Sequence, residues 1–204
     1  MKRILYLPLA LALSTVSLAQ SQGFDFKGLP LGSSVADVKA KFPDYYCSKS
    51  TAGSTLSDTS CRLSPEIKCL SEQAPYPDNR SCREAVMKAM TYAGVDSNIS
   101  LFFYDEKLGM ASVTFGAESF STVVASMRDK HGEPTTKKAE PVTNRMGATF
   151  ENQIMEWKKS GTTIQAEKYA TRVDRSSVKV FDDAYFAEFE KRKGAKSQQG
   201  AKDL

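Results

Sequence analysis

The chain has 204 residues, of which 41% are hydrophobic and 25% are charged, and its formal net charge is +4. A chain of this size can bury a substantial core without help from a metal. The 28 basic and 24 acidic residues nearly balance, whereas nucleic-acid-binding domains usually carry a strongly basic face. The composition therefore argues against nucleic acid as a partner.

Residues 1–19 have the pattern of a secretory signal peptide. Lys2 and Arg3 precede an apolar run from Ile4 to Leu18, and the run closes on the small residue Ala19. The run is shorter than the roughly 20 residues that cross a bilayer as a helix, so a stable membrane anchor is the weaker alternative. We expect cleavage after Ala19 and a periplasmic protein.

A first structural unit is expected over residues 20–116, and it begins with a short helix. Val35, Val38 and Phe42 recur at helical spacing in "SSVADVKAKFP". Ser33 or Ser34 can cap the first turn, and the proline after Phe42 stops the helix. The helix has one apolar stripe, which predicts packing against a single core.

Four cysteines, Cys47, Cys61, Cys69 and Cys82, lie close together and nowhere else in the chain. An even number in an exported protein favours two disulfides, whereas zinc sites need pairs at C-x₂-C-like spacing. Three pairings are possible, and we favour Cys47 with Cys61 and Cys69 with Cys82. These bonds would staple residues 48–82, an insert rich in Ser, Thr, Pro and Asn that we expect to be disordered without them.

A β-hairpin is expected to close the first unit. The runs Ile99 to Tyr104 and Met110 to Phe115 are rich in β-forming residues, and residues 105–109 between them include a glycine. This spacing predicts two antiparallel strands joined by a five-residue loop.

A second unit is expected over residues 117–190. Phe120, Val123, Val124 and Met127 predict a helix that Gly132 ends. The alternating pattern of residues 155–166 predicts a hairpin that turns at residues 159–161, followed by a strand near residues 177–181 and a helix capped by Asp182. The charged tail, residues 191–204, is predicted to be disordered. Together these patterns predict an α+β fold of two tandem-repeat-like helix-plus-antiparallel-sheet units, with a disulfide-stapled insert and a C-terminal helix.

The sequence contains no recognisable catalytic motif. His131, the only histidine, lies at the predicted end of a helix. Interaction with the helix dipole and capping of the last carbonyl groups explain this position better than acid–base catalysis does. Turns, caps and solvated faces account for the acidic residues that a hydrolase would need, namely Asp105, Glu106, Glu151, Asp182 and Asp183. We therefore predict no catalytic residue, no metal site and no cofactor, and keep an envelope hydrolase as the alternative.

A non-catalytic binding protein is the favoured interpretation, either an inhibitor or an assembly factor with an envelope protein as its partner. Aromatic and arginine side chains dominate the energetics of protein interfaces. "TNRMGATFEN" also predicts a turn, with Asn144 and Gly147, that holds an arginine at its tip. The candidate contact residues are Tyr45, Tyr46, Tyr76, Arg145 and Trp157.

Several short motifs resemble those of small exported proteobacterial proteins of uncharacterised function. They are the helix entry "FKGLPLGSSVADVKAKFP", the strands "FFYDEKLGMASVTF", the helix exit "KHGEP" and the turn "NRMGATFEN". In element order the chain is also similar to the beta-lactamase inhibitor protein and BamE-like fold group. It differs by its cysteine-rich insert. The resemblance implies helix-then-strands architecture and a sheet face whose rim loops hold other proteins.

Overall fold

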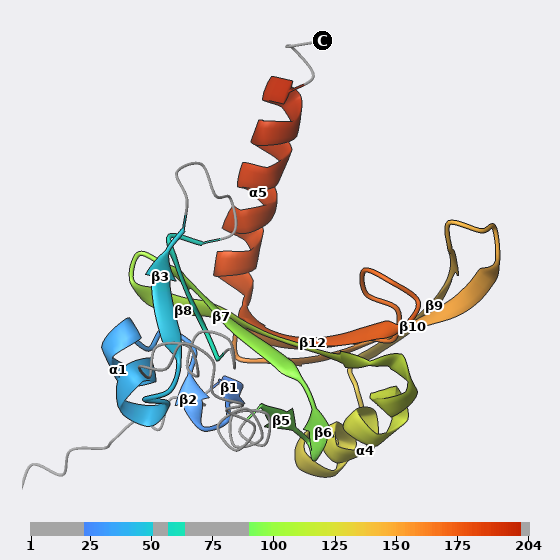
Figure 1. The fold of residues 1–204 in the computed structure, drawn as a ribbon, viewed down its shortest axis with the longest axis horizontal. Coiled ribbons are helices and arrows are strands. Elements are labelled where there is room, and N and C mark those ends of the chain that lie inside the picture. The colour runs from blue at the N-terminus through green and yellow to red at the C-terminus, as the bar shows by residue number, and fades with distance from the viewer. Residues whose placement is uncertain (1–22, 51–56, 64–89, 201–204) are drawn as a thin grey trace, which may run out of the picture.

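The computed structural model describes residues 23–50, 57–63 and 90–200. Within these residues the chain forms one eight-stranded antiparallel sheet with helices on both of its faces (Figure 1). The α+β class is therefore confirmed. The predictions for residues 1–19, Cys69, Tyr76 and Cys82 lie outside the described residues.

The strands of the main sheet follow the order β3-β4-β7-β8-β12-β11-β10-β9. They are β3 (Tyr46–Lys49), β4 (Thr59–Arg62), β7 (Asn98–Tyr104), β8 (Lys107–Gly116), β9 (Thr136–Thr143), β10 (Thr149–Lys159), β11 (Thr162–Glu167) and β12 (Arg175–Asp182). Two small pairs flank the sheet, β1 (Asp25–Phe26) with β2 (Leu29–Pro30) and β5 (Thr91–Tyr92) with β6 (Val95–Asp96). The described helices are α1 (Val35–Lys41), the 3₁₀ turn η1 (Ala117–Ser119), α4 (Phe120–His131) and α5 (Asp183–Gly200).

The two predicted units share a single sheet. Strands β3, β4, β7 and β8 follow α1, and strands β9 to β12 follow α4, so that each helix precedes four strands of one half. The halves join where β12 pairs with β8 along seven residue pairs. Because β4 has four residues and β10 has eleven, the halves are not matched element by element, and the tandem repeat stays a prediction.

Helix α1 begins where the sequence predicts. The Ser34 side chain accepts a hydrogen bond from the Asp37 backbone N–H, and the Asp37 carboxylate accepts one from the Ser34 N–H, which forms a capping box. The hydrogen bonds that the Asp37 carboxylate accepts from the backbone N–H and the hydroxyl of Ser34 lower its pKa, because they favour the charged form. Val38 is fully buried, and it anchors the helix to the core.

Helix α4 buries the predicted stripe. Phe120, Val123, Val124 and Met127 all lie in the core, and Gly132 ends the helix with a φ of 79°. Only glycine adopts this left-handed conformation without strain. The Gly132 carbonyl also accepts a hydrogen bond from Trp157 Nε1 at 2.8 Å, which ties the helix end to β10.

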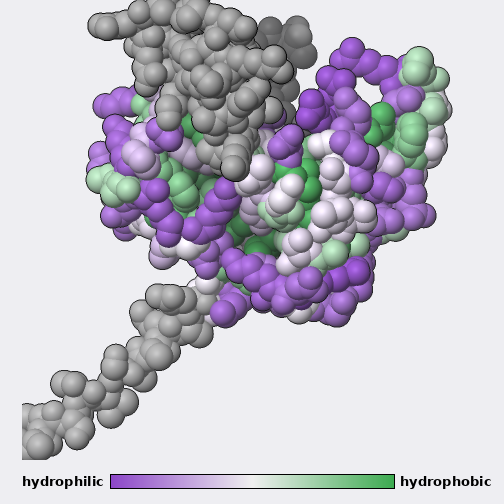
Figure 2. Space-filling view, turned by 60° about the horizontal axis from the view of Figure 1, so that its bottom comes forward, coloured by the Kyte–Doolittle hydropathy of each residue, from purple (hydrophilic) through white to green (hydrophobic). Residues whose placement is uncertain are grey.

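The main core lies between the sheet and the layer formed by α1, α4 and the small strand pairs. Figure 2 shows this side with a hydrophilic rim around a hollow in which hydrophobic side chains are visible. Apolar residues from every part of the described chain meet there, and burial of each large side chain contributes about 1.5–3 kcal/mol. The largest fully buried side chains include Trp157, Phe26, Phe103, Phe115, Ile99, Leu101, Leu108 and Ile164.

Both predicted hairpins are present, and the first has a shorter turn than expected. The predicted five-residue loop at residues 105–109 is wrong, because Asp105 and Glu106 alone make the turn, with φ values of 48° and 60°. The register shifts between Phe102, which pairs with Met110, and Phe103, which pairs with Leu108. This β-bulge allows the pairing of β7 with β8 to extend to Tyr104 and Lys107. The turn at Ser160 and Gly161 confirms the second hairpin.

The disulfide between Cys47 and Cys61 is confirmed. The two cysteines face each other on the antiparallel strands β3 and β4, with their Cα atoms 4.0 Å apart. Residues 59–62, which fall inside the predicted insert, form β4 and pair with β7. This part of the insert therefore belongs to the main sheet.

Helix α5 stands on the opposite face of the sheet (Figure 1). Its first turn is capped by Asp182, whose Oδ1 accepts from the Tyr185 N–H at 3.0 Å, as predicted. Tyr185 packs on Met110 and Phe181, and a side chain at Gly109 would collide with its ring. The helix continues to Gly200, so residues 191–200 are helical where the sequence predicted a disordered tail; pairs such as Arg192 with Glu188 support these turns.

Candidate functional site

Strand alternation gives the main sheet two chemically different faces. The face toward α1 and α4 is apolar and buried. The other face, which we call the open face, lies between α5 at one end and the β9–β10 hairpin at the other (Figure 1). Only the end near α5 is apolar, where Phe102, Met110 and Phe181 lie beneath the helix.

A row of polar side chains crosses the whole open face. Register places one member on each strand, so neighbours in the row lie directly opposite each other. We call this the polar row; its members from edge to edge are Tyr46, Arg62, Ser100, Ser112, Lys179, Gln165, Glu156 and Thr136. Gln165 Nε2 donates to Glu156 Oε1 at 3.2 Å, and Lys158 pairs with Glu156 at 3.5 Å. An exposed sheet face of this kind offers many hydrogen-bonding groups to a partner.

A first hollow of about 390 Å³ lies beside the polar row. On its floor, Ser177 of β12 stands between Thr114 of β8 and Glu167 of β11. Arg175 and Lys179 flank Ser177 on the same strand face. The lining residues are Asn98, Ser112, Thr114, Glu167, Ala170, Thr171, Arg175, Ser177 and Lys179.

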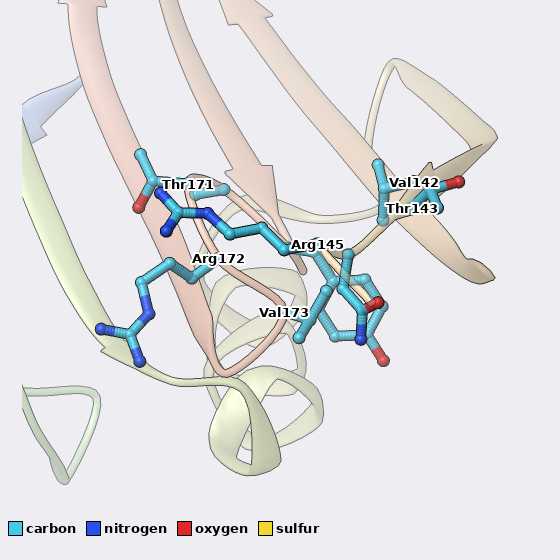
Figure 3. Close-up of a pocket in the computed structure, with 9 residues that line it drawn as sticks. Val142, Thr143, Arg145, Thr171, Arg172 and Val173 are labelled. Carbon is cyan, nitrogen blue, oxygen red and sulfur yellow. The ribbon is translucent and has the colours of Figure 1, made fainter. Parts of the chain in front are cut away.

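A second hollow of about 630 Å³ lies between the β9–β10 turn and the β11–β12 loop. Figure 3 shows the side chains of Arg145 and Arg172 extending in the same direction, toward the side of the hollow where Thr171 lies. The two hollows share Ala170 and Thr171 in their walls. We call the two hollows together the cationic groove.

The loop that separates the hollows is fixed by a buried amide. Asn152 is 1% exposed; its Oδ1 accepts from the Tyr169 N–H at 2.8 Å, and its Nδ2 donates to Glu167 Oε1 at 3.1 Å. Ser176 Oγ donates to the Lys168 carbonyl at 2.6 Å from the core side. Because these bonds are already made, the groove wall needs no ordering when a ligand binds.

Positive charge dominates the cationic groove. Arg172 pairs with Asp174 at 2.9 Å, and both side chains are exposed. Within the described part of the chain, no ion pair engages Arg145, Arg175 or Lys179. Among the described residues, the groove therefore holds three cations without an ion-pair partner and one carboxylate, Glu167, that already accepts a hydrogen bond.

The β9–β10 turn presents a hydrophobic side chain to solvent. Asn144 Oδ1 accepts from the backbone N–H groups of Met146 and Ala148, as expected for a turn in which Gly147 adopts a φ of 84°. Met146 is 90% exposed at the tip, next to Arg145. Exposed methionine is common at surfaces that adapt to a partner.

The five predicted contact residues differ in their exposure and in their position in the fold. Tyr46 is 50% exposed and belongs to the polar row, and Arg145 lines the cationic groove. Tyr45 and Trp157 are 7% and 2% exposed, so both belong to the core and are not available to a partner. Burial raises the pKa of Tyr45 to about 12, which keeps its hydroxyl protonated. Tyr76 lies outside the described residues.

The predicted carboxylates belong to different elements, although Asp105 and Asp182 line one hollow at the base of α5. Asp105 and Glu106 make a hairpin turn, Asp182 caps α5, and Asp183 accepts from Thr163 Oγ1 at 2.7 Å. The described residues contain no group of three or more His, Cys, Asp or Glu side chains arranged to hold a metal ion. Among these same residues, no helix combines the length and apolar character needed to cross a bilayer.

His131 packs beside Phe24 at the end of α4, with ring centroids 5.1 Å apart. Burial and the positive charge of Lys130 lower its pKa, so the neutral ring is favoured. This position is on the core side of the sheet, away from the cationic groove.

Comparison of the chain with protein-family models, with curated proteins and with solved structures found no match. The resemblance in element order to the beta-lactamase inhibitor protein and BamE-like fold group therefore stays a prediction.

The sequence reasoning missed Arg175, Ser177, Lys179 and Met146. For the three β12 residues a signal was present, because "RSSVKVF" alternates apolar residues with polar and charged ones. Once Val178 and Val180 are assigned to the core, the intervening side chains must face the other way. Met146 lies within the turn predicted from Asn144 and Gly147, but it was not identified as a contact residue.

Proposed function

We propose that this is an exported, periplasmic, non-catalytic binding protein that holds an envelope protein on its open face. The observation that carries the proposal is the continuous polar row, which runs across all eight strands of the main sheet. It lies on the sheet face between α5 and the β9–β10 hairpin (Figure 1), where hollows of about 390 and 630 Å³ open. A surface of this shape can surround a convex segment of another protein.

The composition of the face fits a partner that binds and dissociates. Interfaces of this class have a polarity close to that of ordinary protein surface and include aromatic residues, methionine and arginine. Tyr46 lies at one edge of the open face, and Met146 with Arg145 lies at the opposite end. The Cys47–Cys61 disulfide supports an oxidising compartment such as the periplasm.

Site-specific photo-cross-linking tests the proposal in the envelope. A photoreactive residue placed at Ser112, in the middle of the polar row, should capture one protein that the same residue at Lys39 does not capture. Lys39 is an exposed residue of α1, on the other side of the sheet, and is the matched control.

The affinity for the captured protein then gives the decisive measurement. Thr114→Trp places a large ring on the open face, and Lys39→Trp places the same ring on α1. We expect the first substitution alone to weaken binding at least tenfold, because it blocks the contact surface sterically. Unchanged affinity of a folded Thr114→Trp variant would refute the use of this face.

An envelope hydrolase is the second candidate, and one observation favours it. A hollow of about 370 Å³ at the base of α5 is lined by Asp105, Asp182 and Glu188, among others. Asp182 caps α5 and Glu188 pairs with Arg192, so two of the three carboxylates already have structural partners. Hydrolysis of envelope glycan or peptide that is lost in Asp105→Asn would favour this candidate over binding alone.

A further inference from the structure

We propose that the cationic groove binds an acidic segment of the partner protein, with Arg175 and Lys179 each taking one carboxylate and Ser177 donating a hydrogen bond between them. The inference rests on the proposed function and specifies the chemistry of the partner. It depends on the geometry of β12, the unpaired charges and one buried hydroxyl.

The spacing of the two cations follows from the strand. Alternate residues of a β-strand point to the same face and are about 6.6 Å apart, so Arg175 and Lys179 emerge about 13 Å apart with Ser177 midway. An extended peptide has the same repeat, and acidic residues at positions i and i+4 would face the two cations together. The groove thus predicts a spacing as well as a charge.

The charges in the groove are available to a ligand. Neither Arg175 nor Lys179 has an ion pair within the described residues, and Arg145 extends the positive surface into the second hollow. Arginine binds carboxylates through two parallel N–H donors, which gives both energy and orientation. A carboxylate that enters the groove therefore meets cations that it need not detach from any partner in the described part of the chain.

Ser177 supplies an independent observation. The residue is 2% exposed, it lines the first hollow, and its Oγ has no hydrogen-bond partner among the described residues. Buried polar groups are almost always paired, so an unpaired one at the floor of a hollow calls for an explanation. An acceptor oxygen from a bound ligand would complete the hydroxyl's bonding.

The groove favours a protein segment over a polyphosphate or a membrane. Glu167 lines the first hollow beside Ser177, and it would repel a ligand that carries negative charge along its whole length. A segment with separated acidic residues avoids this repulsion. A flat lipid surface cannot reach a floor that lies between α5 and the β9–β10 hairpin (Figure 1).

A peptide titration tests the inference directly. The probe is acetyl-Glu-Gly-Ser-Gly-Glu-amide, and the matched control is the peptide with glutamine in place of both glutamates. Amide resonances of the isotopically labelled exported protein are followed by NMR. We expect saturable shifts centred on residues 175–179 with the acidic peptide only, and no shift with either peptide would overturn the inference.

Two sets of variants show whether the named residues are responsible. Arg175→Gln with Lys179→Gln should weaken acidic-peptide binding about tenfold, because two charge-assisted contacts are lost, whereas Lys39→Gln should not change it. Ser177→Ala should raise the melting temperature and still weaken peptide binding, a combination that a purely structural hydroxyl would not produce. Peptide affinity unaffected by both sets would contradict the assignment.

The outcome is separable from that of the proposed function. If Thr114→Trp abolishes partner binding while Arg175→Gln with Lys179→Gln leaves it unchanged, the open face binds the partner and the acidic-segment inference fails alone. If the acidic peptide binds but Thr114→Trp leaves the partner's affinity unchanged, the proposed function fails. Binding to anionic phospholipid vesicles that the Arg175 and Lys179 substitutions abolish would also overturn the acidic-segment assignment.

Discussion

Two transverse rows, one residue apart along each strand, carry opposite chemistry across the main sheet. The polar row includes Lys179 and Ser112, while the adjacent row on the core face, which we call the apolar row, includes their chain neighbours Val180 and Ala111. The apolar row comprises Cys47, Cys61, Leu101, Ala111, Val180, Ile164 and Trp157. Neighbouring residues of one strand therefore differ in role: one packs in the core, and the next lies on the open face.

The difference teaches that the buried apolar side chains and the more accessible polar ones lie on opposite sides of the same backbone. Polar groups on the open face pair with one another or remain available, whereas the core face is almost wholly apolar. Substitutions in the two rows should therefore affect different measurements. Apolar-row changes should lower stability, and polar-row changes should alter binding.

The largest effect is expected from Trp157→Ala in the apolar row. The substitution removes a fully buried ring and the hydrogen bond from Nε1 to the Gly132 carbonyl. We expect the free energy of unfolding to fall by about 3–5 kcal/mol, measured by urea denaturation. Glu156→Ala, at the next residue but in the polar row, is the control and should cost under about 1 kcal/mol. Equal losses would erase the distinction between the rows.

Loss of the Cys47–Cys61 disulfide should have the next largest effect. The bond closes a loop with a sequence separation of 14 at the edge of the sheet. Replacing both cysteines with alanine should lower the free energy of unfolding by about 3 kcal/mol, because the unfolded chain gains freedom. Thermal denaturation followed by circular dichroism measures the loss. A melting temperature equal to that of the native protein would contradict this prediction.

A smaller effect is expected from protonation of His131 on the core side. Its pKa lies below the usual value of about 6.5, mainly because burial disfavours the charged ring, so the folded state binds its proton less readily than the unfolded state does. Its contribution to stability is present above pH 6.5 and is lost as the pH falls through the folded pKa. Stability should therefore decrease from pH 7 to pH 5.5.

The control for this pH effect is His131→Gln, which removes the only histidine in the chain. The decrease between pH 7 and pH 5.5 should disappear in this variant. Asp37, Glu133 and Glu188 also have lowered pKa values, but carboxylates titrate in a more acidic range and act below pH about 4.5. A pH profile identical in the two proteins would show that His131 is not responsible.

The smallest effect on stability is expected from Lys179→Gln in the polar row. The ammonium group makes no ion pair within the described residues, so its removal should change the free energy of unfolding by under about 0.5 kcal/mol. Chemical denaturation gives this value. A loss of more than about 2 kcal/mol would mean that the open face supports the fold as the core face does.

Local structure was predictable wherever neighbouring residues determine it. Ser34 and Asp37 specify the start of α1, and Gly132 specifies the end of α4. The Asp105–Glu106 turn was missed because glutamate rarely adopts a positive φ, which Glu106 has in this turn between β7 and β8. The extension of α5 was missed because composition gives no weight to ion pairs one turn apart, such as Glu188 with Arg192.

The site was less predictable because it depends on strand order. Arg145 and Tyr46 were identified from residue type and turn chemistry, but the same criteria selected Tyr45 and Trp157, which the core buries. Arg145 and Arg172 line the same hollow, although they belong to different hairpins. No local pattern reports that β12 inserts between β8 and β11, and this insertion creates the cationic groove.

The place of β12 also governs the order of assembly. Of the eight strands of the main sheet, it is the last in chain order, yet it occupies the interior of the sheet between β8 and β11. Until it arrives, each half exposes an unprotected hydrogen-bonding edge, which is a template for self-association. Because β12 must pair with β8 across a long stretch of chain, completion of the sheet is intrinsically slow.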